Sequence, residues 1–410
     1  MHYQHAALHN ELHARPPIYF EGPACLHHFA FVIEGDEVDA LLIRLADATG
    51  TTVSPDQVQQ IVSYQECSVK WERHTEFFTL TIKQANSDDP QTWPTPPEFL
   101  HSVLADYADQ IISASTLRVE TAHRWAGSVE AYGLDKPAGS RIGGDDATVW
   151  SDFNLDDRHI NRFLLVNDRL DNYRLGRMAR RLFDIETYRM MAMLALPEAK
   201  ALSSELQYYE AELSTLSNQH AEQHTSPAEP LLSALTLLSA KLERCGVQTR
   251  QRFSATEAYS SIVFARISEL REERVGHYPQ LGMFILRRFE PATRYCDAMN
   301  RRVETLATSA TRLNDLLRTR SQVEIEGQNY KILQSLDARA SSQLKIQKAV
   351  EGLSIIVISY YIFGLMKLGL ESLSALGIDI EPNVAAAVLI PLGTLIIATL
   401  TWRVWKVKKH

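Results

Sequence analysis

Residues 352–366 read GLSIIVISYYIFGLM, and residues 384–402 read VAAAVLIPLGTLIIATLTW. Neither run contains a charge, and only Lys367 separates the first run from a following LGL. A bilayer core of about 30 Å needs about 20 helical residues. The first run reaches that length if the Lys367 ammonium group snorkels to the interface. We therefore predict two transmembrane helices, 352–370 and 384–402; for the first run the alternative is a buried core helix.

The charges that flank the two runs predict their orientation. Basic residues lie before the first run and after the second, whereas the connector 371–383 holds the acids Glu371, Asp379 and Glu381. Cytoplasmic flanks of membrane helices carry an excess of lysine and arginine. We expect both termini in the cytoplasm, an acidic outer loop, and a basic cytoplasmic tail at 403–410. The basic flanks are Arg339, Lys345, Lys348, Arg403, Lys406, Lys408 and Lys409.

Residues 291–351 predict one long stalk helix that leads into the first span. No proline lies between Pro291 and Pro382. Apolar residues recur at alternating spacings of three and four, which is typical of a coiled-coil seam. A helix of about 75 residues extends roughly 110 Å. The seam contains Val303, Leu306, Ala310, Leu313 and Leu317, shifts at Leu316, Val323 and Tyr330, and resumes as Leu333, Leu336, Ala340 and Leu344.

Amide side chains are unusually frequent on this stalk, and they include the pair Gln328 and Asn329. One interpretation is that some of them face a hydrated axial path in an oligomer. The other is a solvated helix face, with an occasional buried amide that fixes the helix register.

Residues 1–170 favour a compact α/β domain with a mixed or antiparallel sheet. Helices are expected at Asp36–Ala48 and Pro97–Ile112, and the proline-rich residues 88–97, DDPQTWPTPP, predict a surface loop. The whole chain is therefore expected to be an α+β protein with long antiparallel, coiled-coil helices. The candidate strands are Cys25–Ile33, Ile61–Trp71, Glu76–Lys83, Thr116–His123, Thr148–Phe153 and Arg162–Asn167.

Residues 171–290 predict a helical region between this domain and the stalk. Pro197 should kink or break its first helix unless it begins a new one. His220 and His224 have the spacing of two ligands on one helix face, but no carboxylate or cysteine pattern supports a metal site there.

Composition excludes several classes of function. The chain has 410 residues, 42 basic against 50 acidic side chains, and a formal net charge of −8. Nucleic-acid binding usually needs a basic footprint, so nucleic acid is not an expected partner. The four cysteines form no close-spaced pair, and the N-terminus lacks the apolar segment of a signal peptide. We expect reduced thiols and a large cytoplasmic body.

No catalytic constellation emerges from the motifs. RIGGDD, residues 141–146, lacks the lysine and hydroxyl residue of a phosphate-binding loop, and a simple loop is favoured. WERH, residues 71–74, could bind an anion or a neighbouring subunit, or form a hairpin turn with ion pairs. We therefore expect neither an enzyme nor a cofactor. Four histidines and one carboxylate could together bind a metal ion: His9, His13, His27, His28 and Glu11. Polar contacts that fix an N-terminal arm explain these residues as well.

Several motifs are similar to those of an uncharacterised family of bacterial membrane-anchored proteins, a domain of unknown function. The resemblance spans almost the whole chain and implies a location in the bacterial inner membrane, but it implies no activity. The motifs are ELHARPP, WERHTEF, IETYRMMAMLALPEA, LLRTRSQVEIEGQN and VEGLSIIVISYY.

The order of segments also resembles the CorA-type magnesium channels, homopentamers whose stalk and first span line the pore. The resemblance implies a pore mouth near Tyr360, Tyr361, Gly364 and Lys367, with the three acids of the outer loop as a cation-concentrating ring. CorA-type channels end the first span with Gly-Met-Asn, whereas this chain reads Phe363–Lys367, FGLMK. A lysine at the mouth would repel divalent cations unless it faces away from the axis.

Three hypotheses follow, and the third, an enzyme at the membrane, lacks any paired nucleophile and base in the sequence. The first is a CorA-like homo-oligomeric ion channel or transporter in the lipid bilayer, a pentamer if the resemblance holds. The second is a non-conducting, membrane-anchored sensor or interaction protein that displays the cytoplasmic α/β domain.

Overall fold

The computed structural model describes His2, His5 and residues 16–52, 57–222, 227–375 and 382–407. The chain divides into two compact units, which are considered separately. The first unit comprises residues 1–226 and 230–315, and the second comprises residues 227–229 and 316–410.

The first unit contains a mixed β-sheet. Nine strands of the described residues lie in the order β2-β3-β4-β1-β5-β8-β7-β6-β9. Neighbours are antiparallel except β5 and β8, which run parallel. The predicted α+β fold with a mixed sheet is confirmed. The strands are β1 Ala24–Phe31, β2 Gln59–Tyr64, β3 Cys67–Arg73, β4 Phe78–Gln84, β5 Ile111–Thr121, β6 Ala138–Ile142, β7 Ala147–Ser151, β8 Asn161–Asn167 and β9 Glu273–Arg274.

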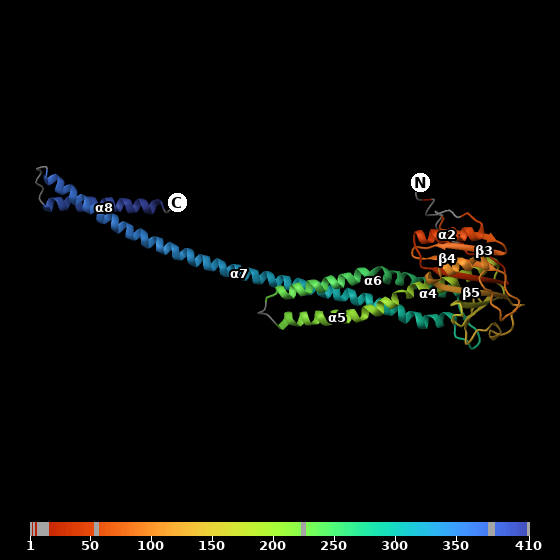
Figure 1. Ribbon diagram of the computed structural model, residues 1–410. Helices are drawn as coiled ribbons and strands as arrows, with labels where there is room; N and C mark the ends of the chain where they lie inside the picture. The colour runs from red at the N-terminus through yellow and green to blue at the C-terminus, as the bar shows by residue number, and fades with distance from the viewer. Residues whose placement is uncertain are drawn as a thin grey trace. The chain divides into compact units, whose positions relative to one another are not determined.

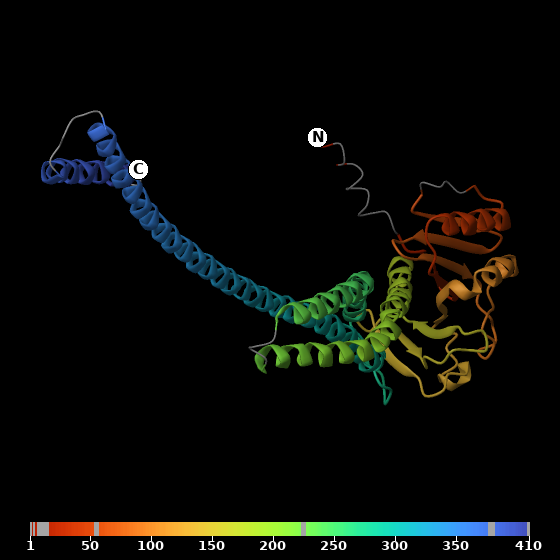
Figure 2. The same cartoon turned by 60° about the vertical axis from the view of Figure 1, so that its left-hand side comes forward.

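Helices cover both faces of the sheet because alternate side chains of each strand point to opposite faces. Leu41, Leu42 and Leu45 of α2 (Asp36–Thr49) pack with Phe29 and Phe31 of β1. Leu26 of the same strand belongs to the second core layer, which it shares with α4 (Asn172–Met193). Figures 1 and 2 show α2 and α4 against the sheet. The other helices on the sheet are α3 (His101–Asp106) and α4 (Asn172–Met193), with short 3-10 turns at Glu98–Leu100, Ala108–Gln110 and Glu130–Tyr132.

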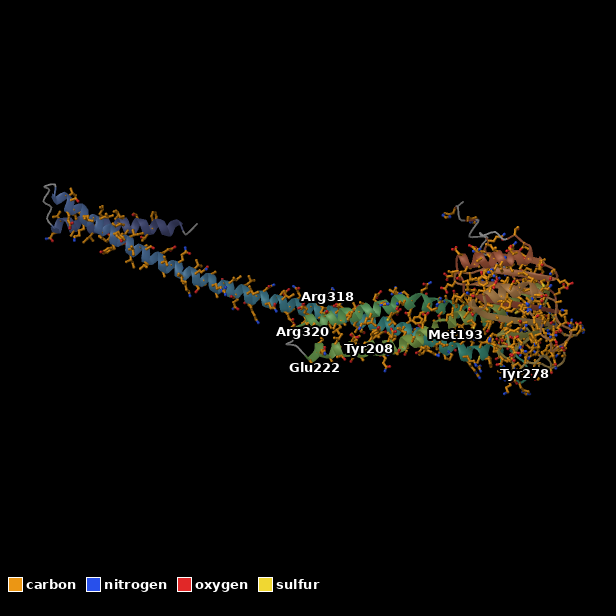
Figure 3. All side chains as sticks on the ribbon, viewed as in Figure 1. Met193, Tyr208, Glu222, Tyr278, Arg318 and Arg320 are labelled. Carbon is orange, nitrogen blue, oxygen red and sulfur yellow. The ribbon has the colours of Figure 1, made fainter. Side chains whose placement is uncertain are left out.

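Three long helices form the antiparallel helical part of the first unit: α5 (Ala195–Glu222), α6 (Glu229–Leu270) and the start of α7 (Leu281–Ala375). All five residues of the predicted seam from Val303 to Leu317 are buried, as the spacing predicts. Polar contacts flank the apolar ones. The Arg302 guanidinium donates to Glu210 at 2.6 Å, and Lys241 lies 5.9 Å from the ring of Tyr208, which Figure 3 labels.

Residues 1–170 differ from the sequence prediction in three main places. The predicted strand Ile61–Trp71 is a hairpin of β2 and β3, whose turn places Gln65 at a left-handed φ of 51°. Because this turn contains no glycine or proline, the sequence gives no sign of a break between the two strands. The predicted helix Pro97–Ile112 is α-helical only at His101–Asp106, and Ile111 already begins β5. The third difference is β6, which was not predicted; its Gly139 faces Trp150 so closely that an added Cβ would clash with the indole.

The helices also begin and end differently from the prediction. Between α4 and α5 the helix breaks at Leu194, so Pro197 lies in the first turn of a new helix. The predicted helical region 171–290 contains β9. The stalk helix begins at Leu281, and Pro291 lies inside it, because Leu281, Ile285 and Phe289 are buried in the sheet core on the N-terminal side of the proline.

Candidate membrane segment

The C-terminal half of α7 is the candidate membrane segment of the second unit. Among the described residues, one helix is long and apolar enough to cross a membrane, and it is α7. None of its most apolar window is buried within the chain. In water such a surface would carry a large hydrophobic penalty, since each Å² of exposed apolar area costs about 25 cal/mol.

The second predicted span lies in helix α8 (Pro382–Val407). The apolar stretch of its described side chains is Ala386–Thr399, which falls within the uncharged residues 384–402. Of the two predicted spans, one described helix, α7, is long and apolar enough to cross a membrane, and the two-span arrangement stays a prediction.

Helices α7 and α8 contact one another at Gly393. A Cβ at this position would lie 3.0 Å from Cε1 of Phe363 and 3.5 Å from Sδ of Met366. Small residues allow close helix packing in membranes. The pore-mouth candidate Gly364 makes no such contact, because an added Cβ there meets nothing within 4 Å among the described residues.

We expect Gly393→Leu to lower the stability of the detergent-solubilised protein by about 1–3 kcal/mol, because the added side chain overpacks the α7–α8 contact. Gly369→Leu is the matched control, since nothing described lies within 4 Å of its added Cβ. Thermal unfolding of the two variants checks the prediction. Equal losses in both would contradict the contact.

The remaining pore-mouth candidates lie on α7. Tyr360 and Tyr361 are exposed, with ring centroids 6.0 Å apart. Ser359, just before them, donates to the Ile355 carbonyl, so its hydroxyl is satisfied within the helix, as a lipid environment requires. The two tyrosines remain available for contacts outside the single chain.

The acidic connector begins differently from the prediction. Helix α7 continues to Ala375, so Glu371 lies in the helix and not in an outer loop. Its carboxylate lies 4.0 Å from Nζ of Lys367, one helical turn earlier. This pair moderates the positive charge at the predicted pore mouth. Asp379 and Glu381 lie outside the described residues.

The stalk part of α7 is exposed over a long distance. Every side chain from 325 to 350 is exposed, including Gln328 and Asn329. The apolar continuation of the seam is exposed as well. Burial of the seam therefore stops at Leu317 within one chain. The exposed apolar residues are Val323, Ile325, Tyr330, Ile332, Leu333, Leu336, Leu344, Ile346 and Val350.

The histidines of β1 do not gather into one site. His27 Nδ1 lies 2.9 Å from Oγ1 of Thr116, whereas His28 Nδ1 lies 2.8 Å from Oγ1 of Thr81. As neighbours on a strand they point to opposite faces. No group of three or more histidine, cysteine or carboxylate side chains with metal-binding geometry is found in the described part of the chain. His9, Glu11, His13 and His224 lie outside it.

The two polar motifs of the first unit lie where strands end in hairpins. Residues 71–74 end β3 and begin its hairpin with β4 (Figure 1), where Glu76 after the turn accepts from Arg252 at 3.1 Å and from Tyr259 at 3.0 Å. Residues 141–146 connect β6 to β7. The hairpin and loop alternatives of the sequence analysis therefore describe both motifs.

Two comparisons give no relative: no curated protein matches the chain, and no solved structure matches it. A family model described as a protein of unknown function, DUF3422, matches residues 1–410. The match covers the folded unit and the apolar end of α7 alike. The chain belongs to the DUF3422 family.

Proposed function

We propose that the chain is a homo-oligomeric membrane protein that conducts ions along an axial path lined by α7, similar in architecture to the CorA-type channels. The observation that carries this proposal is the continuity of α7. One helix of 95 residues contains the buried seam, the exposed stalk and the apolar membrane segment. Such a helix couples a folded domain mechanically to the segment that would line a pore.

The exposed stalk supports the homo-oligomer. Its apolar side chains would face water in a single chain, and covering them with the same helix of other copies removes that cost. Symmetric packing around an axis would also give Gln328 and Asn329 a place on a hydrated path. A pentamer is the expected closed assembly.

The membrane topology in this proposal has two spans in the bacterial inner membrane. Helix α8 would be the second span, held against α7 through Gly393. Basic residues precede the apolar end of α7 and follow that of α8, which favours both termini in the cytoplasm. The region after Lys367 would then face outward.

Ion preference depends on Lys367 and Glu371. A ring of lysines near the axis repels cations, while the carboxylate one turn away reduces that repulsion. We expect Lys367→Asn to raise divalent-cation flux relative to wild type, and Glu371→Gln to lower it, because the second change leaves the lysine charge unmasked. Opposite changes from neighbouring positions distinguish a pore effect from a general loss of structure.

Native mass spectrometry of the detergent-solubilised chain, followed by Mg²⁺ and Co²⁺ flux into liposomes, tests the proposal. A closed pentamer with the two opposite flux changes supports it. A monomer or dimer cannot enclose a pore with two spans per chain. That result, or an absence of flux in wild type and both variants, would leave the alternative, a non-conducting membrane-anchored sensor or interaction protein. The missing Gly-Met-Asn signature favours that alternative.

A further inference from the structure

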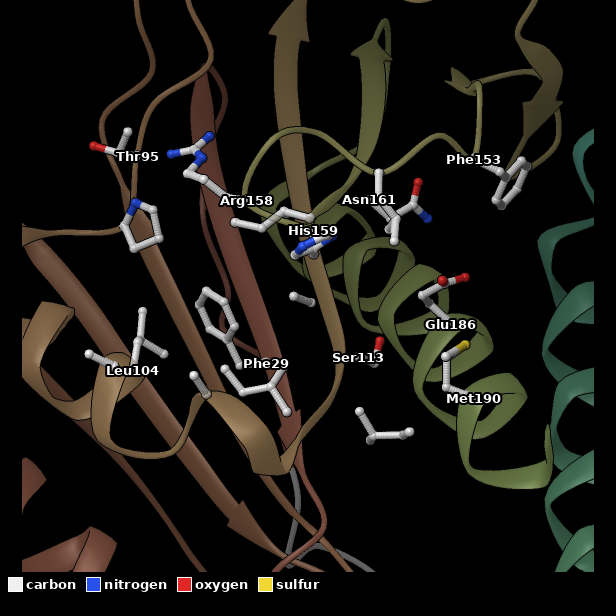
Figure 4. Close-up of a pocket in the computed structure, with 18 of the residues that line it drawn as sticks. Phe29, Thr95, Leu104, Ser113, Phe153, Arg158, His159, Asn161, Glu186 and Met190 are labelled. Carbon is white, nitrogen blue, oxygen red and sulfur yellow. The ribbon is translucent and has the colours of Figure 1, made fainter. Parts of the chain in front are cut away.

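A cavity of about 850 Å³ lies within the first unit. Figure 4 shows its walls: Phe29 and Leu104 lie on one side, Glu186 and Met190 of α4 on the other, and Arg158 and Asn161 at one end. Ligand-binding pockets commonly have volumes of about 300–1,000 Å³. The cavity is thus large enough for a small organic molecule.

The cavity exists because β8 begins later than β5. Ile111, Ser113 and Ala114 of β5 pair with β1, with a bulge at Ile112, but the ladder with β8 starts only at Ser115, opposite Asn161. Beyond that point none of the described strands pairs with this side of β5. Helix α3 and the segment 153–160 surround the gap but do not fill it.

Apolar side chains form most of the walls. They come from strands, from α3 and from α4, so neighbouring elements hold the cavity open from several sides. These side chains cannot hydrogen-bond a ligand, and they favour an apolar body. The apolar lining includes Phe29, Leu104, Ile111, Ile112, Ile160 and Met190.

Two buried polar atoms at the cavity lack partners among the described residues. Asn161 is 2% exposed, and its Oδ1 accepts from Ser151 at 3.2 Å while its Nδ2 has no acceptor. Ser113 is 5% exposed, and its Oγ is likewise unpaired. A buried polar group without a hydrogen bond costs about 1–3 kcal/mol. Both atoms belong to residues that line the cavity.

The charged groups nearby are already neutralised. The Arg189 guanidinium forms two hydrogen bonds with Glu186, and Arg158 donates to Asp156 at 3.0 Å. The cavity therefore has no large excess of positive charge that would demand a phosphate. What remains unsatisfied is one amide donor and one hydroxyl, which suit a single carbonyl or carboxyl group.

We propose that this cavity binds a medium-chain acyl compound, a fatty acid or its ester, with its chain among the apolar walls. Its carbonyl oxygen accepts a hydrogen bond from Asn161 Nδ2 and lies near the Ser113 hydroxyl. This inference is independent of ion conduction, because every lining residue belongs to the first unit.

Photolabelling of the full chain in liposomes tests the site, with a decanoic acid that carries a diazirine near its methyl end. Peptide mapping should place label on α3 and not at the polar end beside Ser113 and Asn161, and excess decanoate should compete for it. We expect Ala114→Trp, which fills the cavity, to reduce this label at least tenfold. Ile43→Trp on the exposed face of α2 is the matched control and should keep it.

The polar end has a test of its own. Asn161→Leu removes the amide donor, and we expect the concentration of decanoate needed for half-competition to rise about tenfold, the equivalent of one hydrogen bond. Methyl decanoate should compete like decanoate if the carbonyl is the group recognised. Competition by decane at the same concentration would overturn the polar assignment. Label confined to the membrane helices, or unchanged in Ala114→Trp with wild-type melting behaviour, would overturn the site.

Discussion

Replacing Arg118 with methionine is expected to lower the free energy of unfolding by about 3–5 kcal/mol, the cost of breaking a buried ion pair from one side. The Arg118 side chain is 1% exposed and lies in the middle of β5. Its Nε donates to Glu120 at 2.9 Å. Methionine fills a similar volume but has no N–H donor, so among the described residues the Glu120 carboxylate keeps only the Asn86 amide at 2.9 Å and the Arg124 guanidinium at 3.6 Å.

The same guanidinium also holds the proline-rich loop on the sheet. Its Nη atoms donate to the carbonyl oxygens of Ser87, Asp89, Pro90 and Thr92 at 2.9–3.0 Å. In the variant these carbonyls lose a charged donor, so the loop should detach before the domain unfolds. Faster amide hydrogen exchange at residues 87–93 would show this. The loop also supplies Thr95 and Pro96 to the cavity wall, so acyl binding should weaken too.

Arg124→Met is the matched control for this prediction. Arg124 donates to Ser87 and to Asp88 at the same loop, but its side chain is 33% exposed. Exposed ion pairs contribute about 0–1 kcal/mol. A loss in Arg118→Met no larger than that in Arg124→Met would show that burial of the guanidinium does not stabilise the loop.

The local pattern of apolar residues predicted the helical seam of the stalk correctly. The seam from Val303 to Leu317 was recognisable because helix contacts repeat every three or four residues, and its burial confirms it. The role of Arg118 was not predicted, since the carbonyls that it binds lie 26–31 residues earlier in the sequence. Its only local signal is a cation within a β-rich run.

The cavity could not be predicted for a related reason. Its walls come from segments between Phe29 and Met190, and each of these residues is ordinary in its own segment. The cavity arises from a difference in strand length between β5 and β8, which depends on pairing and not on composition. The second unit shows the same limit. Gly393 and Gly364 are both glycines within apolar runs, but only Gly393 has a close neighbour among the described residues, so the sequence alone does not distinguish them.

Acidification from pH 7 to pH 5 is expected to cost about 4 kcal/mol of folding free energy through His27 and His28. Burial lowers the pKa of each imidazole from 6.5 to about 3, and nearby cations add to the effect: Arg158 for His27, Lys70 and Arg180 for His28. Between those two pH values the unfolded chain binds a proton at each site and the folded chain does not. The stability that the two neutral imidazoles contribute is therefore fully present above pH 6.5. It decreases as the pH falls from 6.5 to about 3, and below that pH it decreases no further.

The environment of His28 explains why the folded chain excludes this proton. Its ring stacks on Phe183 with centroids 4.7 Å apart, and its Nε2 lies 3.1 Å from Oγ1 of Thr187. Neither neighbour carries a negative charge that could stabilise an imidazolium. The nearby Asp184 acts with the opposite sign, because burial raises the pKa of its carboxyl group and the folded chain gains stability there as the pH falls.

Variants separate the histidine contribution from these other groups. Each of His27→Gln and His28→Gln should reduce the difference in unfolding free energy between pH 7 and pH 5 by about 2 kcal/mol, at about 1.4 kcal/mol per pH unit below 6.5. Chemical denaturation of the solubilised full chain at both pH values measures it. His123→Gln is the control, since that side chain is exposed and should leave the difference unchanged. Glutamine does not take up a proton in this pH range. If the difference between pH 7 and pH 5 persists in the double variant His27→Gln/His28→Gln, groups other than these two imidazoles cause the acid sensitivity.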